Sequence, residues 1–175
     1  KLIIPKWGKF SGFASYSNQV GAGFLPVTGG LFIGADAAGQ LAARGSFPIS
    51  QDQRNTFSSR LRWQPASRLW TSLGFSYGSG LPVENAESSP QDLLPFFGPA
   101  VLNQVNFAAG RLRPSYSLDA ALGIEVWRHE QRSARLQVDG LNLTNHLNVI
   151  NFASLFSGTA LSDPRTISFR AGFSF

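Results

Sequence analysis

Residues 164–175 read PRTISFRAGFSF, and apolar and polar side chains alternate along them. This two-residue period predicts a β-strand with one apolar and one polar face. The apolar face carries Ile167, Phe169, Ala171, Phe173 and Phe175. The opposite face is polar or small, with Arg170 near its middle. The segment therefore predicts a long strand whose two faces meet different environments.

Five further segments repeat this two-residue period. They span residues 7–17, 53–63, 68–78, 114–128 and 133–142, and the first is the least regular because Phe13 breaks its alternation. Most of the six segments are ten to twelve residues long. A tilted strand of about 9–11 residues crosses the hydrocarbon layer of a membrane, whereas soluble strands more often stop at about five or six. Strand length therefore favours a sheet that spans a membrane.

The connections between these segments alternate between short and long. Short turns are predicted at residues 64–67 and 129–132, and long connections at 18–52, 79–113 and 142–163. Short turns at one end and long loops at the other are typical of outer-membrane barrels, whose turns face the periplasm. We therefore expect an all-β fold: an antiparallel up-and-down transmembrane β-barrel segment of about six strands, in the bacterial outer membrane, with a periplasmic C-terminus.

Composition agrees with this class and argues against others. Charged residues make up 14% and aromatic residues 13% of the chain, and no stretch approaches the roughly 20 apolar residues of a transmembrane helix. The net charge is +5, but Lys and Arg are scattered, so no nucleic-acid partner is expected. The chain has no Cys, which excludes disulfides and thiolate metal sites.

Charged residues of the strands fall on the polar face. An Arg that faces lipid at mid-membrane costs about 2–4 kcal/mol, so this segregation predicts a water-filled barrel lumen on the polar side. The predicted lumen-facing residues are Arg54, Arg60, Arg62, Asp119, Glu125, Arg135, Asp139 and Arg170. They either form ion pairs with a part of the protein that fills the lumen or are simply hydrated. The close spacing of Arg54, Arg60 and Arg62 further predicts acidic partners across the lumen.

Aromatic residues lie near the ends of several predicted strands. They are Tyr16, Trp63, Trp70, Tyr77, Tyr116 and Trp127. Outer-membrane barrels carry a band of aromatic residues at each membrane interface, and two such bands would produce this distribution. Strands are, however, rich in aromatic residues in general. Trp70 falls on the polar face by the alternation, which places it beyond the membrane edge.

The connection at 79–113 is unusually apolar for an external loop. It holds Leu93, Leu94, Phe96, Phe97, Val101, Leu102 and Phe107. Such a loop either binds ligand, with Phe96, Phe97 and Phe107 as candidate contacts, or packs against neighbouring loops or a partner. The loop acids Asp36, Asp52, Asp92 and Asp163 are expected to be solvated, since their spacing does not match a calcium loop.

Six strands are too few to close a barrel, because single-chain outer-membrane barrels begin at eight. An open sheet exposes unpaired strand edges, which the interior of a bilayer does not tolerate. We therefore expect the chain to be the C-terminal part of one larger barrel domain.

Several sequence motifs resemble those of one family of outer-membrane proteins. Residues 139–145 (DGLNLTN), 156–160 (FSGTA) and 164–166 (PRT), followed by the Phe-ended strand, resemble the C-terminal end of TonB-dependent outer-membrane receptors. Residues 12–18 (GFASYSN) and 77–82 (YGSGLP) resemble the same group, and the match is closest to carboxypeptidase-regulatory-like receptors of the Acidobacteria type.

The resemblance implies a 22-stranded barrel that encloses a plug domain and takes up a scarce nutrient by energy from the TonB complex. The nutrients of such receptors are iron chelates, cobalamin, glycans or peptides. The plug and the TonB-contacting segment lie N-terminal in the family and are expected to be missing from this chain. The implied partners are outer-membrane lipid, the remainder of the receptor and the barrel-assembly machinery. That machinery would read Phe169, Phe173 and Phe175 as a signal, although these side chains also suit lipid.

No catalytic motif is present, and the two histidines, His129 and His146, lie in separate predicted loops. We therefore expect neither an enzyme nor a bound metal or cofactor. Two alternatives to the receptor remain: a passive porin or adhesin-type barrel, and a soluble all-β binding domain. A soluble domain would have to cover half of each strand's surface.

Overall fold

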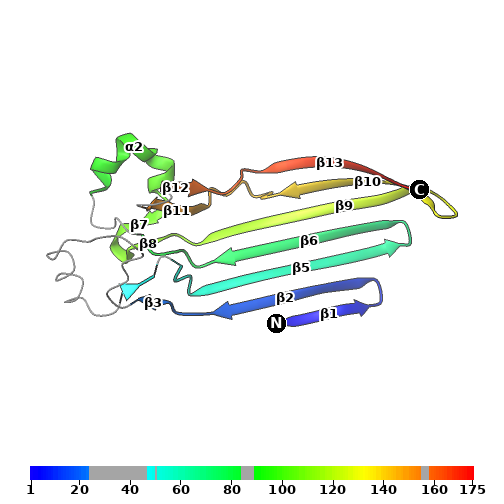
Figure 1. The fold of residues 1–175 in the computed structure, drawn as a ribbon, viewed down its shortest axis with the longest axis horizontal. Coiled ribbons are helices and arrows are strands. Elements are labelled where there is room, and N and C mark those ends of the chain that lie inside the picture. Colours follow the sequence, from blue (N-terminus) through cyan, green and yellow to red (C-terminus); the bar gives the residue numbers. More distant parts are fainter. Residues whose placement is uncertain (24–46, 50, 84–88, 155–157) are drawn as a thin grey trace.

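The computed structural model describes residues 1–23, 47–49, 51–83, 89–154 and 158–175. Its main feature is one antiparallel sheet in which every strand pairs with its neighbours in chain order (Figure 1). The strands are β1 (Leu2–Trp7), β2 (Phe10–Asn18), β5 (Asn55–Ala66), β6 (Leu69–Gly78), β9 (Ser115–His129), β10 (Arg132–Leu141) and β13 (Thr166–Ser174). The predicted all-β, antiparallel up-and-down fold is confirmed.

The sheet has seven strands, one more than the six that the sequence predicted. The expected first segment, residues 7–17, is replaced by β2 and a further strand, β1, joined through a tight turn at Gly8. Gly8 has a φ of 59°, a left-handed conformation that glycine adopts without strain. Strand β1 escaped the pattern because it begins with consecutive apolar residues and contains Pro5, which sheets tolerate on an edge strand.

Short turns and long connections lie at opposite ends of the sheet, which we call the turn end and the loop end. The turns are centred on residues 8–9, 67–68 and 130–131, and the long connections span 19–54, 79–114 and 142–165. Figure 1 shows the turns on the right and the long connections on the left. The strict alternation that the sequence predicted therefore extends to the added strand.

The long connections carry secondary structure of their own. Their described residues form three small two-stranded sheets, β3 (Ala22–Gly23) with β4 (Phe47–Pro48), β7 (Val105–Asn106) with β8 (Arg111–Leu112), and β11 (Val149–Ser154) with β12 (Gly158–Leu161). The second connection also holds the helix α2 (Pro90–Leu102), kinked at Gly98, and the single turn η1 (Phe107–Ala109). None of the helices in the described residues is both long enough and apolar enough to cross a membrane.

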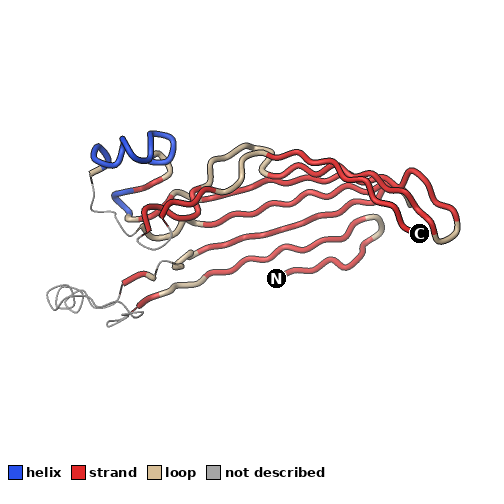
Figure 2. Tube along the Cα trace, turned by 45° about the horizontal axis from the view of Figure 1, so that its top comes forward, coloured by secondary structure: helices blue, strands red, loops and turns tan. Residues whose placement is uncertain are grey.

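Apart from Ala134 on β10, the buried apolar residues of the described chain gather at the loop end. They are Val83, Leu102, Val105, Leu112, Val149 and Phe152, from the second and third long connections. The sheet itself is a single curved layer, with the helices beyond its loop end (Figure 2). Its apolar side chains stay exposed, with Leu73 at 53% and Phe169 at 81%. A continuous apolar surface of this kind has to be covered by lipid or by another chain.

Candidate functional site

The polar face of the sheet carries the charged residues that the sequence assigned to it. Residues paired across an antiparallel sheet share a face, so the register fixes which side chains lie together. Arg60, Gly74 and Asp119 form one such cross-strand row. Seven of the eight predicted lumen residues lie on this face within the sheet: Arg60, Arg62, Asp119, Glu125, Arg135, Asp139 and Arg170. The eighth, Arg54, lies just before β5 at the loop end.

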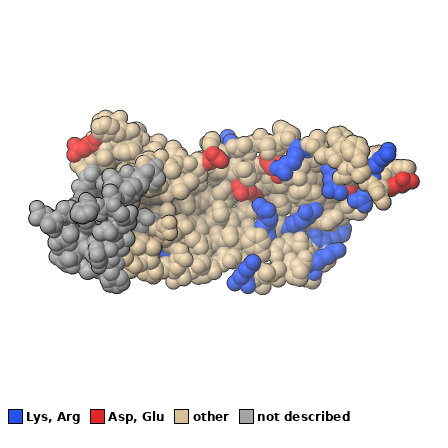
Figure 3. Space-filling view, viewed as in Figure 1, with Lys and Arg blue, Asp and Glu red and all other residues tan. Residues whose placement is uncertain are grey.

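Two of the three acidic residues of this face, Glu125 and Asp139, are paired with Arg side chains, whereas Asp119 accepts hydrogen bonds from Ser117 and the Asn142 N–H. Arg170 Nη2 lies 3.2 Å from Asp139 Oδ2, on the adjacent strand. Glu125 receives two Arg side chains, with Arg128 Nε at 2.7 Å and Arg135 Nε at 3.5 Å from its carboxylate oxygens. Figure 3 shows basic and acidic side chains over the strands, with Lys and Arg in excess toward the turn end.

The acidic partners expected for Arg60 and Arg62 are not found among the described residues, where neither forms an ion pair. The guanidinium carbon of Arg62 lies instead 4.4 Å from the centre of the Trp70 ring, a cation–π contact. Trp70 is on the polar face, as its sequence position indicated, and lies over Gly123, where no Cβ would fit. Sequence reasoning missed this pairing because it depends on the cross-strand register.

On the apolar face, aromatic side chains form a row at each end. Tyr16, Phe57, Tyr77 and Tyr116 are successive cross-strand partners near the loop end. Near the turn end, Phe10 stacks on Trp63 at 6.2 Å between ring centres, and Trp127 lies on β9. Phe57 and Trp63 are six residues apart on β5, which spans about 20 Å at roughly 3.3 Å per residue. Leu61, Leu73, Leu122 and Val138 lie between the two rows.

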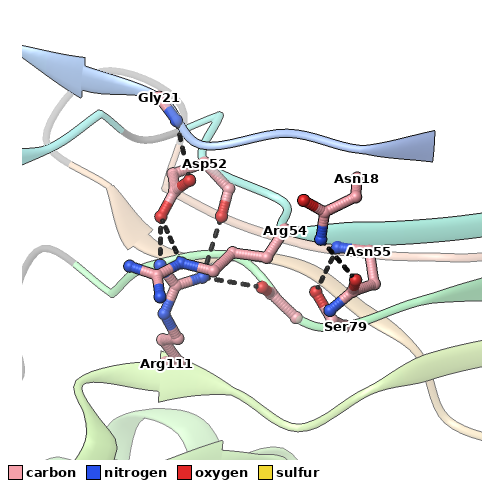
Figure 4. A network of polar contacts seen from close by, with 8 residues as sticks. Asn18, Gly21, Asp52, Arg54, Asn55, Ser79 and Arg111 are labelled. Carbon is pink, nitrogen blue, oxygen red and sulfur yellow. Dashed lines mark hydrogen bonds and ion pairs between the residues drawn. The ribbon is translucent and has the colours of Figure 1, made fainter.

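At the loop end, a polar network joins the first two long connections (Figure 4). Asp52 is buried, with 1% of its surface exposed, although the sequence predicted a solvated loop acid. Its carboxylate accepts hydrogen bonds from the backbone N–H of Gly21 at 2.8 Å and from Arg54 Nε at 3.4 Å, and it forms an ion pair with Arg111. Arg111 Nη1 also donates to the backbone carbonyl of Asp52 at 2.8 Å.

These contacts determine the ionisation of Asp52. The hydrogen bond from the Gly21 N–H, together with the Arg111 guanidinium, lowers the pKa of the carboxyl below its ordinary value despite the opposing effect of burial. Of the other acids expected to be solvated, Asp92 and Asp163 are exposed, and Asp36 lies outside the described residues.

Two of the three candidate ligand contacts in the second long connection pack against the third connection. The ring of Phe97 lies 4.8 Å and that of Phe107 lies 6.4 Å from the ring of Phe152, which is 2% exposed. Phe96 points away from this core and is 80% exposed. The structure therefore separates Phe96 from the two aromatic residues with which the sequence grouped it.

Hydroxyl side chains cross four strands of the polar face in register. Ser15, Ser58, Ser76 and Ser117 are successive cross-strand partners, a row that we call the hydroxyl ladder. The ladder lines a hollow of about 560 Å³ at the junction of the sheet with the third long connection. Other lining residues are Gln53, Thr56, Ser115, Asp119, Asn142, Asn148, Ser162 and Asp163. Sequence reasoning missed this site because single Ser residues on separate strands show no motif.

No protein-family model matches the chain, and no curated protein matches it by sequence. Among solved structures, the chain is similar to the ferric-catecholate import receptor Fiu of E. coli K12 in its closed form, a TonB-dependent receptor. The two share 14% sequence identity with a TM-score of 0.60, over 97% of this chain and 19% of the receptor. The chain thus spans about a fifth of that receptor, and the likeness is one of fold.

Proposed function

We propose that this chain forms part of the barrel wall of a TonB-dependent receptor that takes up a scarce nutrient across the bacterial outer membrane. The observation that carries the proposal is the two-faced sheet. Its exposed apolar face is bounded by aromatic rows about 20 Å apart, close to the roughly 25 Å apolar band of outer-membrane barrels. Its opposite face holds ion pairs and hydroxyl groups.

The fold similarity to a TonB-dependent receptor supports this proposal over a soluble all-β domain and over an enzyme. Within it, the charged polar face lines the lumen, and the C-terminus lies in the periplasm at the turn end. The finer placement among carboxypeptidase-regulatory-like receptors rests on the sequence motifs of residues 139–145 and 156–166. Lipid, the barrel-assembly machinery, the remaining strands with their plug, and the TonB complex are the partners that the proposal requires.

Adjacent residues of β6 offer a direct test, because Ser72 and Leu73 lie on opposite faces of the sheet. A nitroxide spin label is attached at Ser72→Cys or Leu73→Cys in the complete native protein, reconstituted in liposomes. The label at 73 should collide with oxygen, which concentrates in lipid. The label at 72 should collide instead with a water-soluble nickel chelate. Equal accessibility of both labels to the nickel chelate would contradict the membrane assignment.

The mode of transport needs a separate test. Whole cells that carry the native protein should stop taking up its nutrient when the TonB protein is removed, because the proposed receptor is driven by the TonB complex. Uptake that continues without it, in cells whose protein passes the spin-label test, would favour a passive porin.

A further inference from the structure

We infer that the hollow lined by the hydroxyl ladder binds a neutral, hydroxyl-rich ligand, a carbohydrate rather than an anionic metal chelate. The inference rests on the proposed function and names a substrate class for it. It is carried by the chemistry of the lining, by the volume of the hollow and by the spacing of the ladder.

The lining has many neutral hydrogen-bonding groups and no positive charge. Besides the four Ser residues of the ladder, it includes Thr56, Ser115, Gln53 and the carboxylates of Asp119 and Asp163. No Lys, Arg or His is among its described residues. An anionic ligand would meet two carboxylates without a compensating cation, which is unfavourable. Carboxylates are in contrast strong acceptors for the hydroxyl groups of a sugar.

The ladder hydroxyls are available for a ligand. Ser117 Oγ donates to Asp119 Oδ1 at 2.7 Å, but the hydroxyls of Ser15, Ser58 and Ser76 have no hydrogen-bond partner among the described residues. Each hydroxyl is both a donor and an acceptor, as are the hydroxyls of a carbohydrate. Since neighbouring strands lie about 4.8 Å apart, the ladder presents such groups in an evenly spaced row about 14 Å long from β2 to β9.

The surroundings hold this wall in place. Asn148, which is buried, accepts a hydrogen bond from the Tyr116 N–H at 2.9 Å and donates to the Tyr116 carbonyl at 2.9 Å. Asn142, also buried, donates to the carbonyls of His146 and Asp163. Asn148 thereby fixes the third long connection to the start of β9, and Asn142 joins two parts of that connection. The hollow of about 560 Å³ falls in the size range of ligand sites, roughly 300–1,000 Å³.

The test measures binding to the complete native protein in detergent by titration calorimetry. The probes are a series of neutral malto- and cello-oligosaccharides of two to six units, with a ferric tris-catecholate as the anionic probe. At least one oligosaccharide should bind, and the catecholate should bind more weakly. Ser58→Ala and Ser76→Ala each remove one ladder hydroxyl and leave the rest of the side chain unchanged. Each should weaken oligosaccharide binding about fivefold to tenfold, as expected for one hydrogen bond.

The matched control is Ser72→Ala, on the same face and in the same strand as Ser76 but outside the lining of the hollow. It should leave binding unchanged. The inference is overturned if no oligosaccharide binds, if the catecholate binds more tightly, or if all three variants behave alike. If the binding test fails but the labels at 72 and 73 show the expected accessibilities, the protein is still a membrane barrel. Failure of the carbohydrate inference is therefore distinguishable from failure of the proposed function.

Discussion

The carboxylate of Asp52 forms a buried ion pair with the guanidinium of Arg111, which follows it by 59 residues in the chain. Arg111 Nη1 also reaches the backbone carbonyls of Asp52 and Gly80, at 2.8 and 3.3 Å. One side chain thus connects the first long connection to the second. The loop end is held together by this polar network and by the apolar core around Phe152, while the sheet below it has no core of its own.

Loss of Arg111 should loosen the loop end. Arg111→Met leaves the buried Asp52 carboxylate with the half-exposed Arg54 as its one cationic partner among the described residues, so the cost should lie below the about 3–5 kcal/mol of a buried charge left wholly unpaired. We expect the Gly21 amide, which donates to Asp52, to exchange its hydrogen much faster in native-state hydrogen exchange. Arg113→Met, at an exposed position of the same connection, is the control and should change little. Unchanged exchange at Gly21 in the first variant would show that the pair does not hold the loops.

Acid should weaken the loop end through Asp52. Because its pKa is lower in the folded than in the unfolded chain, the ionised carboxylate stabilises the fold above the unfolded-state pKa of about 3.9. That stabilisation is lost as the pH falls below this value and through the folded-state pKa. The free energy of unfolding, measured from pH 7 to pH 3, should therefore fall less steeply in Asp52→Asn than in the wild type below about pH 4. Parallel curves would contradict this role.

Phe152 should be the most sensitive apolar residue of the loops. Phe152→Ala removes a ring packed between Phe97 and Phe107, and such changes cost about 3–5 kcal/mol. Phe96→Ala, at an exposed ring of the same helix as Phe97, should cost under about 0.5 kcal/mol. The loss of stability in each variant is measured by chemical denaturation of the native protein, with hydrogen exchange of the loop amides as the readout. A comparable loss of stability in the two variants would contradict the packing.

Local pattern predicted the sheet far better than it predicted the loop end. The alternation of β5, β6, β9, β10 and β13 is visible in the sequence because one face of each strand is mostly apolar and the other mostly polar or small. Asp52 looked like any other loop acid, since its burial depends on Arg111, a distant residue with no periodic relation to it. The packing of Phe97 on Phe152 is hidden for the same reason. The hydroxyl ladder requires the register between strands, which a single strand's pattern does not contain.

The two faces of β6 should respond oppositely to a new charge. Leu73→Arg places a guanidinium on the apolar face between the aromatic rows, where lipid contact costs about 2–4 kcal/mol. Ser72→Arg places it on the polar face, opposite Arg62 and Ala121, and should cost less. Unfolding of the native protein from liposomes gives both values. Equal costs would mean that the apolar face is covered by something other than lipid.

The end of β13 should govern how efficiently the barrel assembles. Phe169, Phe173 and Phe175 are exposed, the first two at 81% and 70%, and β13 has an unpaired edge within the described sheet. Such an edge is a template for strand addition, and the rings beside it can guide the partner strand. We expect Phe175→Ala and Phe173→Ala to reduce the amount of native protein in the outer membrane, while Phe75→Ala, on the same face but within the sheet, reduces it less. The folded fraction is measured on gels that compare heated with unheated samples, because a folded barrel and an unfolded chain migrate differently. If Phe75→Ala lowered the folded fraction as much as the terminal variants, the rings would act through lipid contact, and the proposed assembly signal would be contradicted.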